Sequence, residues 1–96
     1  MKDRHPFVVI TLREINRLGI CMAVPITSGG QFARSQGLTV PIQGKRIQGV
    51  AICNQIRSFD LSERISRGDS SYIETLDGLT MDEIINRVVS VIDPGP

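Results

Sequence analysis

The chain has 96 residues and a mass of 10.6 kDa, which is the size of one domain and too small for two. At this length the gain from burying apolar surface roughly balances the lost chain entropy, so we expect a marginal monomer that benefits from a partner subunit. No stretch approaches the ~20 apolar residues of a membrane span, and no secretory signal follows Met1. We therefore expect one cytoplasmic domain over residues 1–96, without a membrane span.

The net charge of +1 conceals a strong polarity along the chain. Residues 1–57 carry eight Lys/Arg and two Asp/Glu (+6), whereas residues 58–96 carry three and eight (−5). Nine of the eleven cations are arginine, whose planar guanidinium makes bidentate contacts to phosphate and carboxylate. The pattern favours one cationic face; the alternative is charge scattered over a solvated surface.

Cys21 and Cys53 each lie within an apolar run and belong to no CxxC pair. Two cysteines are too few for a disulfide scaffold, so we expect reduced thiols in the core. One histidine and two separated cysteines are also a poor set of zinc ligands. We expect no metal and no other cofactor.

Ile and Val number 21 against six Leu, a ratio that favours strands. Apolar runs predict strands at residues 6–11, 19–27, 38–42 and 47–56. Apolar residues at 12, 15 and 18, closed by Gly19, predict one helical turn after the first strand. Pro25 indicates an edge position or a bulge in the second strand, because proline cannot donate to the ladder. A long polar loop follows over residues 28–37.

The last forty residues predict one main helix. Residues 58–71 read as a polar connection with a helical turn around 61–65, and Tyr72–Leu76 as a last short strand. Thr80 and Glu83 form a capping box, which predicts where the C-terminal helix starts. We expect its apolar stripe to pack on the sheet: Met81, Ile84, Ile85, Val88, Val89 and Ile92. The fold class is therefore mainly β with a C-terminal helix, as a small antiparallel barrel.

Polar residues gather where the second and fourth strands end. Thr27 closes the second strand, and Asn54, Gln55 and Arg57 close the fourth. If these strands pair, we expect the two groups to share one rim of the sheet. The backbone amides of Ser28–Gly30 can approach an anion closely, because glycine has no side chain in the way; an ordinary turn is the alternative.

Two segments resemble the MazF/PemK family of toxin endoribonucleases, most closely its ChpB and Kid branch. They are PITSGGQFAR at residues 25–34 and GVAICNQIRSFD at residues 49–60, with His5–Ile10 and Met81–Ile92 similar to a conserved strand and the C-terminal helix of the family. The resemblance covers about residues 5–92. It implies a toxin domain with an SH3-like barrel that forms a homodimer and cleaves single-stranded RNA without a metal. It also implies an antitoxin with an acidic tail, which suits a cationic surface that binds RNA phosphates as well.

The resemblance implies a catalytic role for Thr27, whose hydroxyl stabilises the charge that develops on phosphorus. His5 stands where the family usually has an arginine before the proline, and we expect its imidazole to act as acid or base. Arginines for phosphates, Phe32 for stacking and polar side chains for base edges complete the expected RNA site: Arg4, Ser28, Gln31, Phe32, Arg34, Asn54, Gln55 and Arg57. The alternatives are a solvated His5, a loop-capping Thr27 and a Phe32 anchored in the core.

The chain begins where the second strand of the family begins, so we expect the first strand and the loop over the RNA site to be absent. With His5 replacing an arginine, one alternative is a truncated member that binds RNA or antitoxin without cleaving RNA. A third interpretation, a toxin that poisons a protein such as a topoisomerase, is disfavoured by the cationic region and the TSGG loop.

Overall fold

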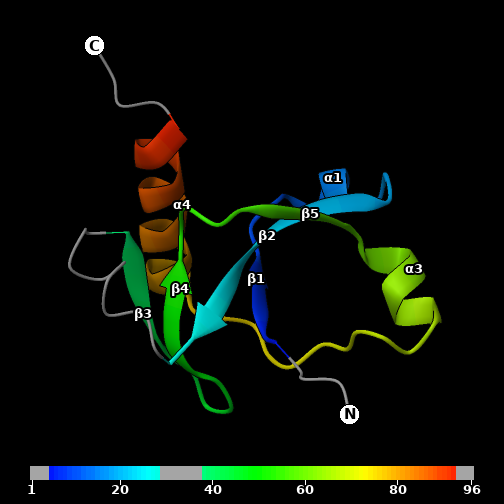
Figure 1. Cartoon of the computed structure of the whole chain (residues 1–96), viewed down its shortest axis with the longest axis horizontal. Helices are drawn as coiled ribbons and strands as arrows, with labels where there is room; N and C mark the ends of the chain where they lie inside the picture. Colours follow the sequence, from blue (N-terminus) through cyan, green and yellow to red (C-terminus); the bar gives the residue numbers. More distant parts are fainter. Residues whose placement is uncertain (1–4, 29–37, 93–96) are drawn as a thin grey trace.

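The computed structural model describes residues 5–28 and 38–92. Figure 1 shows the elements in chain order, with α4 on one side of the molecule and α3 on the other. The strands are β1 (Phe7–Val9), β2 (Ile20–Thr27), β3 (Thr39–Gln43), β4 (Gln48–Ile52) and β5 (Arg57–Asp60). The helices are α1 (Arg13–Asn16), α3 (Leu61–Ser66) and α4 (Gly78–Ile92).

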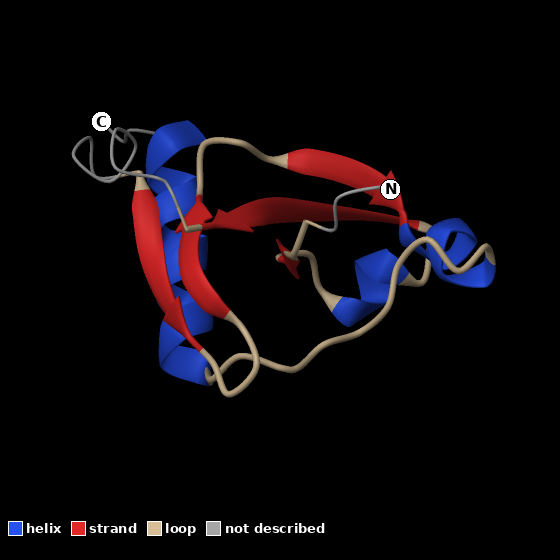
Figure 2. Ribbon diagram, turned by 60° about the horizontal axis from the view of Figure 1, so that its bottom comes forward, coloured by secondary structure: helices blue, strands red, loops and turns tan. Residues whose placement is uncertain are grey.

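All described strand pairs are antiparallel, and β2 lies at the centre. One edge of β2 pairs with β1; the other pairs first with β5 and then with β4, which forms a hairpin with β3. Figure 2 shows α4 along β3 and β4, with α1 and α3 toward the opposite end. The predicted fold class is confirmed. The strand order β1-β2-β4-β3, with β5 on β2, leaves the sheet open within the described ranges.

Pro25 lies where β2 changes partners: β2 is a central strand, but within the described ranges neither β5 nor β4 pairs with Pro25, so the expected edge position holds locally. Ala23 is the last β2 residue paired with β5, and Ile26 is the first paired with β4. On the β1 side, Pro25 stands opposite Phe7 in a non-hydrogen-bonded pair. The backbone nitrogen and carbonyl of Pro25 therefore point away from β1. The missing amide hydrogen of proline therefore breaks no hydrogen bond of the ladder.

The core lies between the sheet and α4. Strand alternation directs Val24 and Ile26 toward the helix, where they meet Ile84 and Val88. The buried cluster consists of Val8, Val24, Ile26, Val40, Ile42, Ala51, Cys53, Ile84 and Val88. Cys21 and Cys53 are buried free thiols, as predicted, and burial raises the pKa of both.

The apolar stripe on α4 is only partly buried. Ile84 and Val88 are buried, and Met81 and Ile85 are half-buried. Val89 and Ile92 remain 52% and 63% exposed, because they lie beyond the edge of the face that meets the sheet. The prediction is thus confirmed for the first part of the stripe and wrong for these last two residues.

The start of α4 differs from the predicted capping box. Asp77, just before the helix, accepts a hydrogen bond from the Thr80 amide at 2.7 Å. Thr80 itself lies within the first turn, so its pairing with Glu83 does not begin the helix. An aspartate that accepts from the first-turn amides satisfies the same donors as the predicted cap. This hydrogen bond is the main reason that the pKa of Asp77 lies below its ordinary value.

Two strand boundaries were also predicted wrongly. β4 ends at Ile52, where a turn forms and the Gln55 amide donates to the Ile52 carbonyl at 3.2 Å. β5 follows at Arg57–Asp60, in a segment that polar residues had marked as a connection. Residues 72–76 form no strand. None of the described helices is both long and apolar enough to cross a membrane.

Candidate functional site

Thr27 lies at the end of β2, on the face opposite α4. Its neighbour Ile26 belongs to the core, so strand alternation turns Thr27 the other way. The Ile26 amide donates to the Pro6 carbonyl at 2.9 Å, which continues the β1–β2 register beyond Phe7. His5 lies two residues before β1, and the same register, continued by one residue, predicts that it stands opposite Thr27 in a non-hydrogen-bonded pair. We therefore expect the two candidate catalytic residues to share one face of the sheet.

Gly49 fixes the end of β2 from the other side. Thr27 pairs with Val50, and a Cβ atom placed on Gly49 would lie only 2.7 Å from the Thr27 carbonyl oxygen. Gly49 also has φ +151°, a conformation that residues with a side chain rarely adopt. Glycine at this position lets the backbone of β4 approach the residue that carries the candidate hydroxyl.

A basic turn lies beside this end of β2. The β3–β4 hairpin closes with the pair Gln43–Gln48, and the Gly44 amide donates to the Ile47 carbonyl at 2.8 Å. Because β2 and β4 are antiparallel, β2 ends toward the turn that joins β3 and β4 (Figure 1), and this turn carries the exposed Lys45 and Arg46. We did not assign these two cations to the site from the sequence. Their signal in the sequence is a Lys-Arg pair between the strands predicted at residues 38–42 and 47–56, and it becomes informative only when the β2–β4 register is known.

Asn54, Gln55 and Arg57 do not share this rim. Arg57 pairs with Ala23, four residues before Thr27, which is about 13 Å along the strand. The expectation of one shared rim is wrong because neighbouring antiparallel strands end at opposite ends of the pair. Arg57 nevertheless lies on the same face as Thr27, since alternate residues of β2 point the same way. Asn54 and Gln55 are exposed in the turn between β4 and β5.

The remaining residues of the expected site fall into two groups. Ser28 is exposed and directly follows Thr27 at the rim. Arg4, Gln31, Phe32 and Arg34, together with the two glycines after Ser28, lie outside the described residues. Their expected contacts with RNA therefore stay predictions.

An aromatic pair covers the middle of the same face. The rings of Phe7 and Phe59 meet edge to face with centroids 5.0 Å apart, and the small Ala23 side chain of β2 lies between their strands. The Arg64 guanidinium lies 4.7 Å from the centre of the Phe59 ring, within the range of a cation–π contact. Arg57 pairs with Ala23 across the β2–β5 ladder, so this face carries two arginines, Arg57 and Arg64, beside the aromatic pair. Such a combination suits the phosphates and bases of an unpaired strand.

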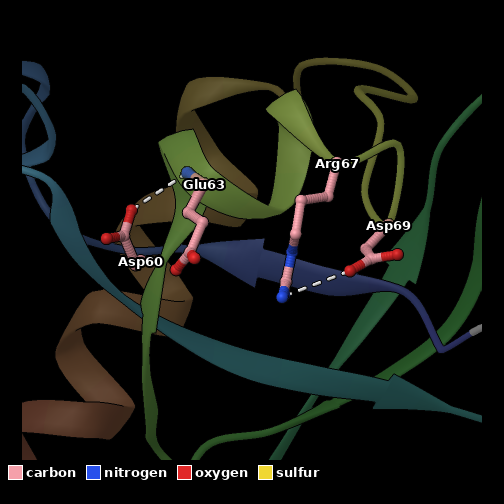
Figure 3. Close-up of polar contacts among 4 residues, drawn as sticks. All are labelled: Asp60, Glu63, Arg67 and Asp69. Carbon is pink, nitrogen blue, oxygen red and sulfur yellow. Dashed lines mark hydrogen bonds and ion pairs between the residues drawn. The ribbon is translucent and has the colours of Figure 1, made fainter.

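Local contacts hold α3, which carries Arg64, in place (Figure 3). The Asp60 carboxylate accepts from the Glu63 amide at 3.0 Å and thereby caps the start of the helix. Just after the helix, Arg67 forms an ion pair with Asp69 at 3.2 Å. Both side chains of that pair are more than half exposed, so it adds little stability and the cap matters more.

The Glu74 side chain contacts the basic turn by accepting hydrogen bonds from the backbone amides of the turn. Its Oε2 atom accepts from the amides of Arg46 and Ile47 at 2.7 and 2.9 Å, and its Oε1 atom from that of Lys45 at 3.1 Å. These bonds, that of Arg46 first, hold the pKa of Glu74 below its ordinary value. Glu74 therefore stays ionised at neutral pH, at the centre of three converging N–H groups.

A family model described as PemK-like, MazF-like toxin of type II toxin-antitoxin system matches residues 1–92. The chain belongs to this toxin family. It is 33% identical over 87 residues to the endoribonuclease toxin ChpB of Escherichia coli K12, covering 88% of this chain and 68% of that protein. It is 32% identical over 91 residues to endoribonuclease PemK of Escherichia coli, covering 92% and 65%. The chain thus spans about two thirds of the length of these curated relatives.

Solved structures of PemK/MazF toxins share the fold. A chain of the MazE–MazF crystal structure from Deinococcus radiodurans superposes with a TM-score of 0.77 at 21% identity, covering 93% of this chain and 82% of that one. An endoribonuclease in complex with its cognate antitoxin, from a mycobacterial species, gives a TM-score of 0.74 at 17% identity, covering 92% and 80%. At these identities the likeness establishes the fold.

Proposed function

We propose that this member of the family is the toxin of a type II toxin–antitoxin pair and an endoribonuclease that cuts single-stranded RNA where Thr27 and His5 meet. The observation that carries the proposal is the β1–β2 register, seen as far as the hydrogen bond from Ile26 to Pro6, which when continued by one residue brings His5 opposite Thr27, near the basic turn of Lys45 and Arg46. Membership in the toxin family and the two endoribonuclease relatives support it.

The proposed reaction uses the 2′-hydroxyl of the RNA itself as the nucleophile. The His5 imidazole takes the hydroxyl proton while the 2′-oxygen forms a bond to the adjacent phosphorus. The bond from phosphorus to the 5′-oxygen breaks, and that oxygen receives the proton back from the imidazolium. The Thr27 hydroxyl donates a hydrogen bond to a non-bridging oxygen as negative charge builds there. The products are a 2′,3′-cyclic phosphate and a 5′-hydroxyl, and we propose that no metal takes part.

We also propose that the protein acts in the cytoplasm as a homodimer bound by a cognate antitoxin. The antitoxin is supported by the two solved structures, which are a MazE–MazF complex and an endoribonuclease in complex with its cognate antitoxin. The dimer is supported by large apolar side chains that stay exposed in two places. One group lies on and around α1 and the other on α4: Leu12, Ile15, Leu18 and Ile20, and Val89 and Ile92. Exposed clusters of this kind mark interaction surfaces.

The test is to incubate the purified protein with an unpaired RNA in the presence of EDTA. We expect discrete fragments that end in cyclic phosphates. Thr27→Val removes the hydroxyl at nearly constant volume and should slow cleavage about 100-fold, the usual effect of losing one such donor. His5→Gln should slow it about 100-fold or more. Ser90→Ala removes a hydroxyl from α4 and should leave the rate unchanged.

Two other outcomes would count against this proposal. Binding without cleavage would instead support a non-catalytic family member that holds RNA. No binding at any protein concentration would contradict RNA as the substrate.

A further inference from the structure

The turn between β3 and β4 has the geometry of an anion site. The amides of Lys45, Arg46 and Ile47 all donate to one carboxylate, that of Glu74, at 2.7–3.1 Å. Gly44 makes the close approach possible, because a Cβ atom there would lie 2.6 Å from Glu74 Oε2. Successive backbone N–H groups that converge in this way form a concave site for an anion, whichever molecule supplies it.

Glu74 carries one negative charge beside the two cations of the turn, and the charge of Arg46 contributes to the lowered pKa of Glu74. In the described ranges, the ion pair between side chains is that of Arg67 with Asp69, and neither Lys45 nor Arg46 forms one. Both side chains are exposed, and the Arg46 Nη1 atom donates to the Ile73 carbonyl at 3.4 Å. The turn therefore offers three amides and two positive charges to a single carboxylate. A phosphodiester, whose single negative charge is shared by two non-bridging oxygens, is well matched to such a set of donors.

The turn also lies at the end of the sheet where β2 ends with Thr27. Thr27 pairs with Val50, and Ile47 lies three residues before Val50, just ahead of the start of β4, about 10 Å away at the spacing of a strand. An unpaired RNA strand cut at Thr27 would pass this turn with a neighbouring phosphate. Glu74 belongs to residues 67–77, which contain no helix or strand, so its carboxylate can leave without breaking a regular element.

We propose that the turn Gly44–Ile47 binds a backbone phosphate of the RNA substrate, and that Glu74 occupies this position in the free protein and leaves it when RNA binds. The inference rests on the proposed function and adds to it a second phosphate position with an internal competitor. Glu74 then weakens RNA binding in two ways: it fills the amide site and it places a negative charge there.

The experiment measures binding of a 12-nucleotide 2′-O-methyl RNA of mixed sequence by fluorescence anisotropy, between 50 and 300 mM KCl. This probe lacks the attacking hydroxyl and stays intact. Glu74→Ala should bind at least threefold more tightly than the parent protein. The slope of log K against log salt should steepen by about 0.7, the value for one more phosphate contact on a single strand. Glu74→Gln, which keeps the side-chain shape, should also bind more tightly, and the control Glu83→Ala on α4 should match the parent.

Amide NMR spectra of the Glu74→Ala variant give a second readout. Addition of the RNA probe should shift the signals of Lys45, Arg46 and Ile47 together with that of Thr27. If Thr27 shifts while the three turn amides stay still, or if Glu74→Ala and Glu83→Ala bind alike, the phosphate position is refuted and the proposed function survives. If the parent protein binds no RNA, both fail. If Glu74→Ala gains affinity for poly-glutamate and not for RNA, the turn takes a carboxylate from a protein partner and the inference is wrong.

Discussion

Replacing Gly49 by alanine tests how closely β4 approaches the candidate catalytic threonine. The new Cβ atom would lie 2.7 Å from the Thr27 carbonyl oxygen and 3.1 Å from the Ile26 side chain. A backbone oxygen held in a β-ladder cannot move as easily as the end of a flexible side chain. The substitution should therefore displace the end of β2, and with it the Thr27 hydroxyl.

The expected cost has two parts. An alanine at φ +151° costs roughly 1–3 kcal/mol in backbone strain. Forcing the methyl group against β2 adds roughly 1–3 kcal/mol, as for other intrusions into packed structure. The reduced freedom of the unfolded chain returns about 0.4–1 kcal/mol. The free energy of unfolding should thus fall by roughly 1–6 kcal/mol.

Gly19 provides a matched control, because it has φ +108° and a Cβ atom there meets no atom within 4 Å. Gly19→Ala introduces the backbone strain without the steric clash, so the free energy of unfolding should fall by roughly 1–2 kcal/mol. Urea unfolding followed by circular dichroism measures both variants. Without urea, where both variants are folded, RNA cleavage should be slower than in the parent protein for Gly49→Ala and unchanged for Gly19→Ala. Equal stability losses in the two variants, or equal cleavage rates, would refute the close approach.

Three further predictions concern the core, the acid limb of stability and the thiols. Ile84→Ala should cost about 2–5 kcal/mol because the side chain is fully buried, whereas Ile92→Ala should cost the monomer less than about 1 kcal/mol; equal costs in urea unfolding would show that α4 packs differently. Glu74 and Asp77 have lowered pKa values in the folded state, so their contribution is complete above the ordinary carboxyl pKa of about 4 and is lost as the pH falls through the lowered values. The Glu74→Gln/Asp77→Asn double variant should therefore lose stability at pH 6 and show a flatter decline below pH 4, measured by urea unfolding at each pH. Burial raises the pKa of Cys21 and Cys53, so both should react with Ellman's reagent at pH 8 far more slowly than in urea; fast native reaction of either would contradict its burial.

The sequence was most informative where one segment decides its own structure. Apolar runs of Ile and Val located β1 to β4, and the stripe through Ile84 and Val88 located α4, because burial on one face imposes its period on the sequence. β5 was missed because Arg57 and Ser58 are exposed and its one large apolar residue, Phe59, packs on Phe7 from a strand 50 residues earlier. A contact of that kind leaves no local pattern.

The candidate site shows the same limit. Thr27 and His5 were both proposed from the sequence, but the expectation that they share one face of the sheet comes only from the β1–β2 register. The shared rim with Arg57 was wrong, since strand ends alone do not reveal which ends meet in an antiparallel pair. The basic turn was missed for the same reason. Its carboxylate partner, Glu74, comes from a segment that had been predicted as a strand.

The central claim is that His5 and Thr27 work together at one cleavage centre. A double-mutant cycle on the single-turnover rate of RNA cleavage tests it most directly, using His5→Gln, Thr27→Val and the double variant. If the two residues act on the same phosphorus, the double variant should be no more than about threefold slower than the slower single variant. If the rate reduction in the double variant equals the product of the two single reductions, the two residues act independently. Unchanged rates in both single variants would place the chemistry elsewhere on the protein.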